Sequence, residues 1–364
     1  MTPNGHADIE SLNDRERTIL RHVVRQFIET AAPVGSRALA EGTDMGLSSA
    51  SIRNSMNALE AAGLLNQPHT SAGRIPTALG YRAYVDELMG TGDLSATERQ
   101  ILRQALDQRF GDHESVTRET SRLLGRLTRL LGVVLTPQLS SGTLERLEIV
   151  PVSSTRVLVV LAISGGLIRT ILAEVEAEWP ALAERARGLD RIVSLLNERL
   201  AGLTLDEIRR TGSDRVQDLD SEDETGVVRL VLRQAPQLFR SEPEARRAQV
   251  GGAEHLTEQP EFQDLDSVKG VLQLLGREED VVQLLEDQES DPPSASAGRA
   301  IVRIGWSLPG QSSTQVRTFS IVAAPYHVGA SVGRVGVIGP TRMDYAHAVA
   351  LVEFAATLLS ETRS

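Results

Sequence analysis

The apolar residues in the first part of the chain recur at helical spacing in three successive segments. Asn13 precedes the first segment and Glu16 stands three residues later, which is the pattern of a capping box at a helix start. The apolar stripe of this helix lies within residues 19–28. A short second helix is predicted from Gly35, and a third over residues 48–62, where a serine can cap the first turn. This part of the chain therefore predicts three consecutive helices.

A segment rich in turn-forming residues follows the third helix. Gly63 stands where a left-handed helix end belongs, and the two leucines after it suit a short strand. Residues 67–76 contain the proline, glycine and hydroxyl residues of a loop, and Thr77 can cap a fourth helix. Three helices, a loop and a further helix are the order of parts in a winged helix-turn-helix, which contacts duplex DNA. Residues 1–90 are therefore predicted to form a winged-helix DNA-binding domain.

Beyond residue 90 the pattern alternates between helical and strand-like segments. Residues 95–131 and 181–250 are predicted to be mostly helical, and the acidic residues 214–224 to form a solvated loop. Because a mostly helical block separates two strand-rich blocks, the sequence predicts an α+β multidomain chain in which one domain holds an insertion. Six apolar segments of strand length are predicted to be strands, at 144–151, 157–163, 167–175, 300–304, 315–324 and 332–338. The first three of them are predicted to form an antiparallel meander.

Composition narrows the class of protein. The 364 residues contain no cysteine, which excludes disulfides and thiolate metal sites and suits a reducing, cytoplasmic environment. The first residues lack the basic start and apolar core of a signal peptide, and no apolar run is long enough to span a membrane. We therefore expect a cytoplasmic protein without membrane contact.

The net charge of −11 is unusual for a protein that binds DNA, because DNA-binding surfaces are normally basic. Residues 1–90 hold 8 arginines against 10 acidic residues, a balance of −2. Within residues 48–82 the balance is instead +2, from three arginines against one glutamate. We therefore expect the positive charge to be local, and DNA affinity to require a dimer and to fall with salt.

The third predicted helix carries candidate DNA-contacting side chains. Short hydrogen-bonding residues and one arginine near a helix N-terminus suit base edges and phosphates in a major groove. The alternative is an ordinary polar face turned to solvent, but the preceding helix-turn and the following loop favour DNA contact. The candidate residues lie off the apolar stripe of this helix, and Ser55 is expected to share that polar face. The assigned candidates are Ser51, Arg53, Asn54 and Asn57.

The loop at 67–76 carries two further candidates. Arg74, expected at the loop tip, can enter a minor groove or contact a phosphate. His69 can donate a hydrogen bond to a phosphate, although a single histidine is more often an ordinary polar loop residue. Both are assigned to the candidate DNA-binding surface.

Features of catalytic and metal sites are scarce. The seven histidines are scattered without metal-binding spacing, and residues 164–166 are typical of a hairpin turn rather than a nucleophile elbow. Gly333, Gly336 and Gly339 alternate with valines, which predicts a close-packed strand rather than a phosphate cradle. We therefore expect no enzyme, no metal site and no cofactor.

Four sequence blocks carry a resemblance that extends over almost the whole chain. They are PVGSRALA at 33–40, SIRNSMNALEAAGLLNQPHTSAGRIPTALGYRAYVDELM at 51–89, GGAEHLTEQPEFQDL at 251–265 and VGRVGVIGPTRMDYAHAV at 332–349. Together they resemble the HrcA family of heat-inducible transcription repressors. The second and fourth blocks are the most specific.

The resemblance implies a homodimer that represses chaperone operons by binding an inverted-repeat operator in double-stranded DNA. It implies a winged-helix domain at 1–90, a discontinuous GAF-like domain at 91–180 and 263–364, and an inserted, mostly helical dimerising domain at 181–262. It also implies that the chaperonin supports the active repressor. Heat would then inactivate the repressor by diverting the chaperonin to unfolded proteins.

Matching positions in the family add Ser36 and Arg37, in the second predicted helix, to the candidate DNA-binding residues. Two alternatives stay open beside the operator-binding repressor. The first is a winged-helix regulator switched by a small ligand in the GAF-like domain. The second is a protein that binds the chaperonin without DNA, which the local positive charge of residues 48–82 disfavours.

Overall fold

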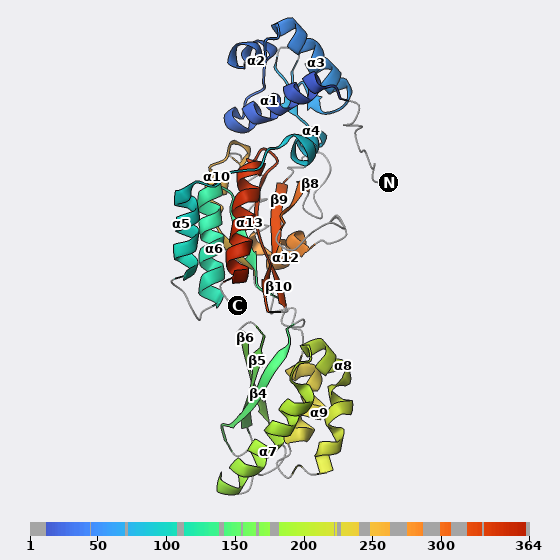
Figure 1. Ribbon diagram of the computed structural model, residues 1–364, viewed down its shortest axis with the longest axis vertical. Helices are drawn as coiled ribbons and strands as arrows, with labels where there is room; N and C mark the ends of the chain where they lie inside the picture. Colours follow the sequence, from blue (N-terminus) through green and yellow to red (C-terminus); the bar gives the residue numbers. More distant parts are fainter. Residues whose placement is uncertain are drawn as a thin grey trace. The chain divides into compact units, whose positions relative to one another are not determined.

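The chain forms two compact units, which are described separately (Figure 1). The first comprises Met1–Val134, Gln249–Ala324 and Val335–Ala355, and the second comprises Leu135–Ala248, Pro325–Arg334 and Ala356–Ser364. The computed structural model describes residues 12–43, 45–69, 72–107, 113–137, 142–153, 156–164, 167–174, 182–221, 223, 227–239, 248–262, 275–286, 299–306, 319–329 and 331–361.

The first unit begins with the three helices that the sequence predicts. Asn13 and Glu16 form the expected capping box, and the side chain of Ser48 accepts a hydrogen bond from the backbone N–H of Ser51. Both caps satisfy backbone groups that a helix start leaves without partners. The helices are α1 (Asp14–Thr30), α2 (Ser36–Gly42) and α3 (Ser49–Ala61).

A small antiparallel pair of strands and a fourth helix follow α3 (Figure 1). Thr77 caps the fourth helix, as the sequence predicts, by accepting a hydrogen bond from the backbone N–H of Gly80. We refer to residues 12–88 as the N-terminal module. Its remaining elements are β1 (Leu65–Asn66), β2 (Ile75–Pro76), α4 (Ala78–Ala83) and a π-helical turn, η2 (Tyr84–Leu88).

Two glycines allow backbone segments of the N-terminal module to meet closely. A Cβ atom on Gly73 would collide with the backbone of Val34, which is bridged to Arg74 by N–H···O bonds of 2.9 and 2.8 Å. A Cβ atom on Gly80 would collide with the carbonyl group of Leu64. These contacts hold the loop base and α4 against the helices. The apolar core of the module includes Ile19, Leu20, Val23, Val24, Leu39, Ile52, Leu59 and Leu65.

A five-stranded sheet lies mainly in the first unit, and its strand order is β7-β3-β10-β9-β8. The sequence did not predict β3 or β7, and the expected helix over 95–131 overlaps the start of β3. All five residues of β3 are buried, so the strand lacks the alternation that marks a half-exposed strand. The strands are β3 (Leu131–Leu135), β7 (Ala248–Gly251), β8 (Ile301–Trp306), β9 (Phe319–Val328) and β10 (Ser331–Pro340).

Three helices stand together against one side of this sheet (Figure 1). Glu98 of α5 lies 2.7 Å from the ring of His347 of α13, and Arg99 of α5 lies over the ring of Phe354. Hydrogen bonds from Ser95 and His347 lower the pKa of Glu98 to about 2. The helices are α5 (Ala96–Asp107), α6 (His113–Thr128) and α13 (Tyr345–Glu361), and the shorter segments are α10 (Ala253–Thr257), η6 (Pro260–Phe262) and α12 (Glu278–Glu286).

The glycines of β10 confirm the prediction of a close-packed strand. A Cβ atom on Gly333 would collide with the ring of Tyr326, whose hydroxyl donates to the carbonyl of Leu135 at 3.0 Å. A Cβ atom on Gly336 would collide with the backbone of β9, and one on Gly339 with a leucine side chain. Each glycine therefore makes room for a neighbouring strand or side chain.

The second unit is a three-stranded antiparallel sheet with helices packed on one face (Figure 1). The predicted meander is confirmed, and so is the capping box of Thr204 and Glu207. Strand residues 144–174, which the resemblance assigns to the GAF-like domain, share one continuous apolar core with the helices after them. The elements are β4 (Leu144–Pro151), β5 (Arg156–Ile163), β6 (Leu167–Glu174), α7 (Leu182–Leu200), α8 (Leu205–Val216), η4 (Gln217–Ser221) and α9 (Val227–Leu238).

The acidic stretch 214–224 does not form the solvated loop that the sequence predicts. Helix α8 and the 3-10 segment η4 continue through residue 221. Asp223 is buried, and its carboxylate accepts a hydrogen bond from the backbone N–H of Val228 at 2.6 Å. The charge of this aspartate serves the first turn of α9, where an anion is stabilised by unpaired backbone N–H groups.

Candidate nucleic-acid interface

Helix α3 turns Arg53, Asn54 and Asn57 to solvent and leaves Ser51 half-buried. The opposite face of the helix packs into the core of the N-terminal module. The placement of Ser55 among the exposed polar residues is wrong, because this side chain is only 3% exposed. Ser55 follows a buried isoleucine by three residues, a spacing that puts both on the same helix face.

Arg74 lies at the base of its loop, next to β2, and not at the tip that the sequence suggests. One guanidinium nitrogen, Nη2, donates to Oδ1 of Asn57 at 2.9 Å and lies 2.8 Å from Oε2 of Glu60. The side chain of Arg74 is 13% exposed. This arginine therefore joins the loop to α3 and holds the amide of Asn57 in place.

The remaining candidates lie on α2 and in the loop. Ser36 is buried, and its hydroxyl is 3.3 Å from the hydroxyl of Ser49 at the start of α3. Arg37 is exposed and pairs with Glu41 one turn later, with 2.9 Å between Nε and Oε1. His69 is exposed in the loop. Ser36 thus helps to set the position of α3, whereas the side chains of Arg37 and His69 are exposed to solvent.

The positive charge on the surface formed by α2, α3 and the loop is concentrated on one arginine. Arg37 and Arg74 are each paired with a glutamate, which reduces their net charge in the absence of a ligand. Arg53 is exposed and has no ion-pair partner among the residues that the structure describes. A phosphate approaching α3 would therefore meet Arg53 as a cation without a competing carboxylate.

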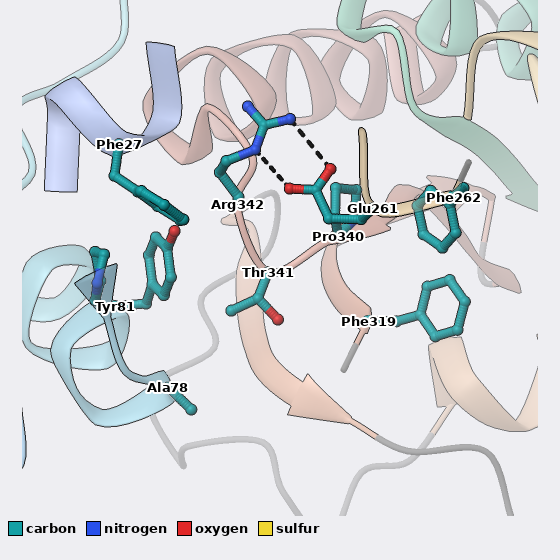
Figure 2. Close-up of a pocket in the computed structure, with 10 residues that line it drawn as sticks. Phe27, Ala78, Tyr81, Glu261, Phe262, Phe319, Pro340, Thr341 and Arg342 are labelled. Carbon is teal, nitrogen blue, oxygen red and sulfur yellow. Dashed lines mark hydrogen bonds and ion pairs between the residues drawn. The ribbon is translucent and has the colours of Figure 1, made fainter. Parts of the chain in front are cut away.

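A second feature of the first unit is a cavity of about 290 Å³ (Figure 2). It lies where α1, β2 and α4 meet the residues 261–262 and 340–342. Arg342 and Glu261 form a two-pronged ion pair on its wall, with N···O distances of 2.6 and 3.1 Å. Aromatic and proline side chains make up most of the lining, namely Phe27, Pro76, Tyr81, Phe262, Phe319 and Pro340.

A third feature is the outer face of the sheet in the second unit, opposite the helices. Four large apolar side chains on it or at its edge are exposed to solvent, by 45% to 71%. The strand register aligns Val150, Leu158 and Leu172 in one row across the three strands. The exposed residues are Val150, Val152, Ile168 and Leu172.

In the described part of the chain, no three acidic or histidine side chains are grouped so that they would hold a metal ion. None of the helices in the described ranges is long and apolar enough to cross a membrane.

The identity of the chain follows from its similarity to known proteins. Residues 114–349 match the family model for the HrcA protein C-terminal domain. The heat-inducible transcription repressor HrcA of Chlorobium chlorochromatii is 38% identical over 359 residues, which cover 98% of this chain and 99% of that protein. The chain belongs to the HrcA family of heat-inducible transcription repressors. The HrcA proteins of Chlorobium luteolum and Chlorobaculum parvum are each 39% identical, over 97% and 96% of this chain and over 98% and 97% of their own lengths.

Membership in this family places the chain among transcription repressors of the heat-shock response. A crystal structure of a hypothetical protein has a similar fold, with a TM-score of 0.55 and 24% sequence identity. The match covers 97% of this chain and 98% of that one. The mixed arrangement of helices and strands is therefore found in an experimental structure along nearly the whole chain.

Sequence reasoning missed the cavity and the apolar sheet face. The cavity combines residues that are up to about three hundred positions apart, and no local pattern marks such a set. The sheet face left a signal, because β5 is apolar at almost every position instead of alternating. Such a strand is normally covered on both faces.

Proposed function

We propose that this repressor binds an inverted-repeat operator in double-stranded DNA, with the N-terminal module acting as a winged helix-turn-helix. In this arrangement α3 enters a major groove, and the loop between β1 and β2 lies along the neighbouring backbone. The observation that carries the proposal is the exposed row of Arg53, Asn54 and Asn57 on α3, with Arg74 tying the loop to that row. Ser36, Arg37, Ser51 and His69 complete the proposed surface.

Replacing Arg53 by alanine tests the role of α3. We expect operator affinity to fall by about 1–3 kcal/mol, because the variant removes a base or phosphate contact. Fluorescence anisotropy with a labelled operator duplex measures the loss. Arg25→Ala, which removes an exposed arginine from α1 of the same module, serves as the matched control. Equal affinities for the two variants would show that α3 is not the DNA-contacting helix.

The pair formed by Arg74 and Glu60 leads to a second expectation. Glu60→Gln removes the carboxylate that neutralises Arg74, so the guanidinium becomes available to a phosphate. We expect tighter operator binding and a salt dependence of log Kd that is steeper by about one phosphate contact. Glu41→Gln, which frees the exposed Arg37 instead, provides a comparison on α2. An unchanged salt slope in Glu60→Gln would mean that Arg74 has only a structural role.

We further propose that the repressor is a homodimer whose interface is the apolar outer face of β4, β5 and β6. A twofold interface uses the same patch on both copies. On this face an apolar group of Val150, Leu158, Ile168 and Leu172 lies beside the ion pairs Arg146–Glu148 and Arg156–Glu174, and apolar and paired charged groups can each meet their like in a second copy. Contiguous exposed apolar surface of this kind is typical of interaction sites. The dimer would set the two α3 helices roughly 34–36 Å apart, or a multiple of that distance, along the DNA.

In this proposal the three-part organisation implied by the family is kept. The winged-helix domain at 1–90 binds the operator, residues 91–180 and 263–364 contribute the discontinuous GAF-like domain, and the inserted region at 181–262 supports dimerisation by packing against the inner face of the sheet whose outer face forms the interface. The shared core of β4–β6 and α7–α9 supports a dimerising unit that includes residues 144–174 as well.

We also propose that the chaperonin supports the active state of the repressor. A marginally stable repressor needs only a few kcal/mol between active and inactive states to respond to chaperonin supply. Operator titrations with and without chaperonin and ATP test this point. Enhanced binding supports the proposal, whereas binding that ignores the chaperonin favours direct heat sensing or a small ligand.

A further inference from the structure

We propose that the cavity beside Tyr81 binds a small, uncharged ligand with a flat apolar body and one carbonyl-type hydrogen-bond acceptor. The cavity measures about 290 Å³, which is at the small end of the range for small-molecule sites. A compact molecule of the size of a substituted benzene suits such a space. Three observations define its chemistry: one buried hydroxyl, one neutralised ion pair and a set of aromatic walls.

The buried hydroxyl of Tyr81 favours a ligand that carries a hydrogen-bond acceptor. This side chain is 2% exposed and lines the cavity, and its Oη atom has no hydrogen-bond partner among the described residues. Buried tyrosine hydroxyls normally have a partner. In Figure 2 the hydroxyl end points toward Phe27 and away from Ala78. Burial raises the pKa of Tyr81, so the hydroxyl stays protonated and can donate to a ligand oxygen.

The ion pair on the cavity wall favours an uncharged ligand. Nε and Nη2 of Arg342 bind the two carboxylate oxygens of Glu261, and Nη1 donates to the carbonyl of Ile28 at 2.6 Å. Nη2 also donates to the side chain of Gln259 at 3.1 Å. Each guanidinium nitrogen of Arg342 therefore already donates a hydrogen bond, and the positive charge is neutralised by the carboxylate of Glu261. A charged ligand would lose its hydration without gaining a counter-ion.

The walls favour a flat apolar body. The rings of Phe262 and Phe319 are stacked with centroids 5.6 Å apart, and both side chains are buried. Phe27 and Tyr81 contribute two more rings from the N-terminal module. Aromatic rings attract one another in offset or edge-to-face arrangements beyond the gain from burial alone.

The position of the cavity gives ligand binding a consequence. Phe27 and Tyr81 belong to the N-terminal module, whereas Phe262 and Phe319 belong to the sheet-containing part of the same unit. A ligand that contacts both sets stabilises their docked arrangement. An effect of the ligand on operator binding rests on the proposed function, but ligand binding itself does not.

Three probes of similar size test the site in the full-length protein by saturation-transfer NMR and ligand-observed titration. They are acetophenone, α-methylstyrene, in which a CH2 group replaces the carbonyl oxygen, and benzoate, which is anionic. We expect acetophenone to bind about two- to tenfold more tightly than α-methylstyrene, the worth of one hydrogen bond, and benzoate to bind most weakly. Tyr81→Phe should remove the advantage of acetophenone and leave α-methylstyrene unchanged.

Two further variants locate the binding. Ala78 is exposed at the edge of the cavity, and Ala78→Phe should block it and abolish binding of both neutral probes. Ala50→Phe, at an exposed alanine in the first turn of α3, is the matched control and should bind normally. No saturation transfer to acetophenone, equal binding of the two neutral probes, or undiminished binding by Ala78→Phe would each overturn the proposal. None of these readouts uses DNA, so a failure here is distinct from a failure of the operator proposal.

Discussion

Replacing Ile168 by aspartate is expected to convert the repressor from a dimer into monomers and to remove most of its operator affinity. Ile168 is 71% exposed on the outer face of β6, so the substitution leaves the fold of the second unit intact. Each dimer buries two copies of this side chain, and each copy contributes about 1.5–3 kcal/mol when buried. The dimer dissociation constant should therefore rise by about 100-fold or more.

Sedimentation velocity over a range of concentrations measures the dissociation directly. Operator affinity should fall with it, because two linked DNA-binding modules gain about 100-fold or more over one. Ser194→Asp introduces the same charge at an exposed position of α7 and should leave the dimer unchanged. A variant at Ile168 that stays dimeric at low concentration would place the interface elsewhere.

Replacing Gly80 by alanine is expected to destabilise the N-terminal module by about 3 kcal/mol, the upper end of the usual cost of overpacking. The added Cβ atom would lie well within 3.0 Å of the carbonyl oxygen of Leu64, a distance that real Cβ atoms do not approach. Backbone cannot give way as the end of a flexible side chain can. Helix α4 must therefore move away from the carbonyl group of Leu64, and this movement also displaces the cap at Thr77.

Chemical denaturation followed by circular dichroism measures this loss. Gly42→Ala is the matched control, because Gly42 also lies in a helix and an added Cβ atom has nothing within 4 Å. That variant should be neutral or gain up to about 1 kcal/mol, since alanine favours helix over glycine. Similar stability of the two variants would show that α4 is not packed as closely as the structure indicates.

Much of the local structure could be predicted from the sequence, because caps and periodicity act over a few residues. Asn13, Ser48 and Thr77 each begin a helix, and the apolar segments at 144–175 form the expected meander. The short strands β3 and β7 were missed. Fully buried or very short strands carry no alternation, and only their partners in the sheet stabilise them as strands.

The candidate DNA surface was predictable in outline but not in detail. The exposure of Arg53, Asn54 and Asn57 follows from helical periodicity. The position of Arg74 depends on the bridge to Val34 and on its pairing with Glu60, and these contacts join segments that are distant in the sequence. The cavity around Tyr81 is likewise a product of tertiary packing, so no sequence pattern could reveal it.

The most direct test of the central claim is a titration of the full-length repressor with a duplex inverted repeat from upstream of a chaperonin operon, beside a scrambled duplex of equal length. Binding should be specific for the inverted repeat, should weaken as salt rises, and should be reduced in Arg53→Ala but not in Arg25→Ala. Equal affinity for the two duplexes, with the dimer folded, would contradict the account.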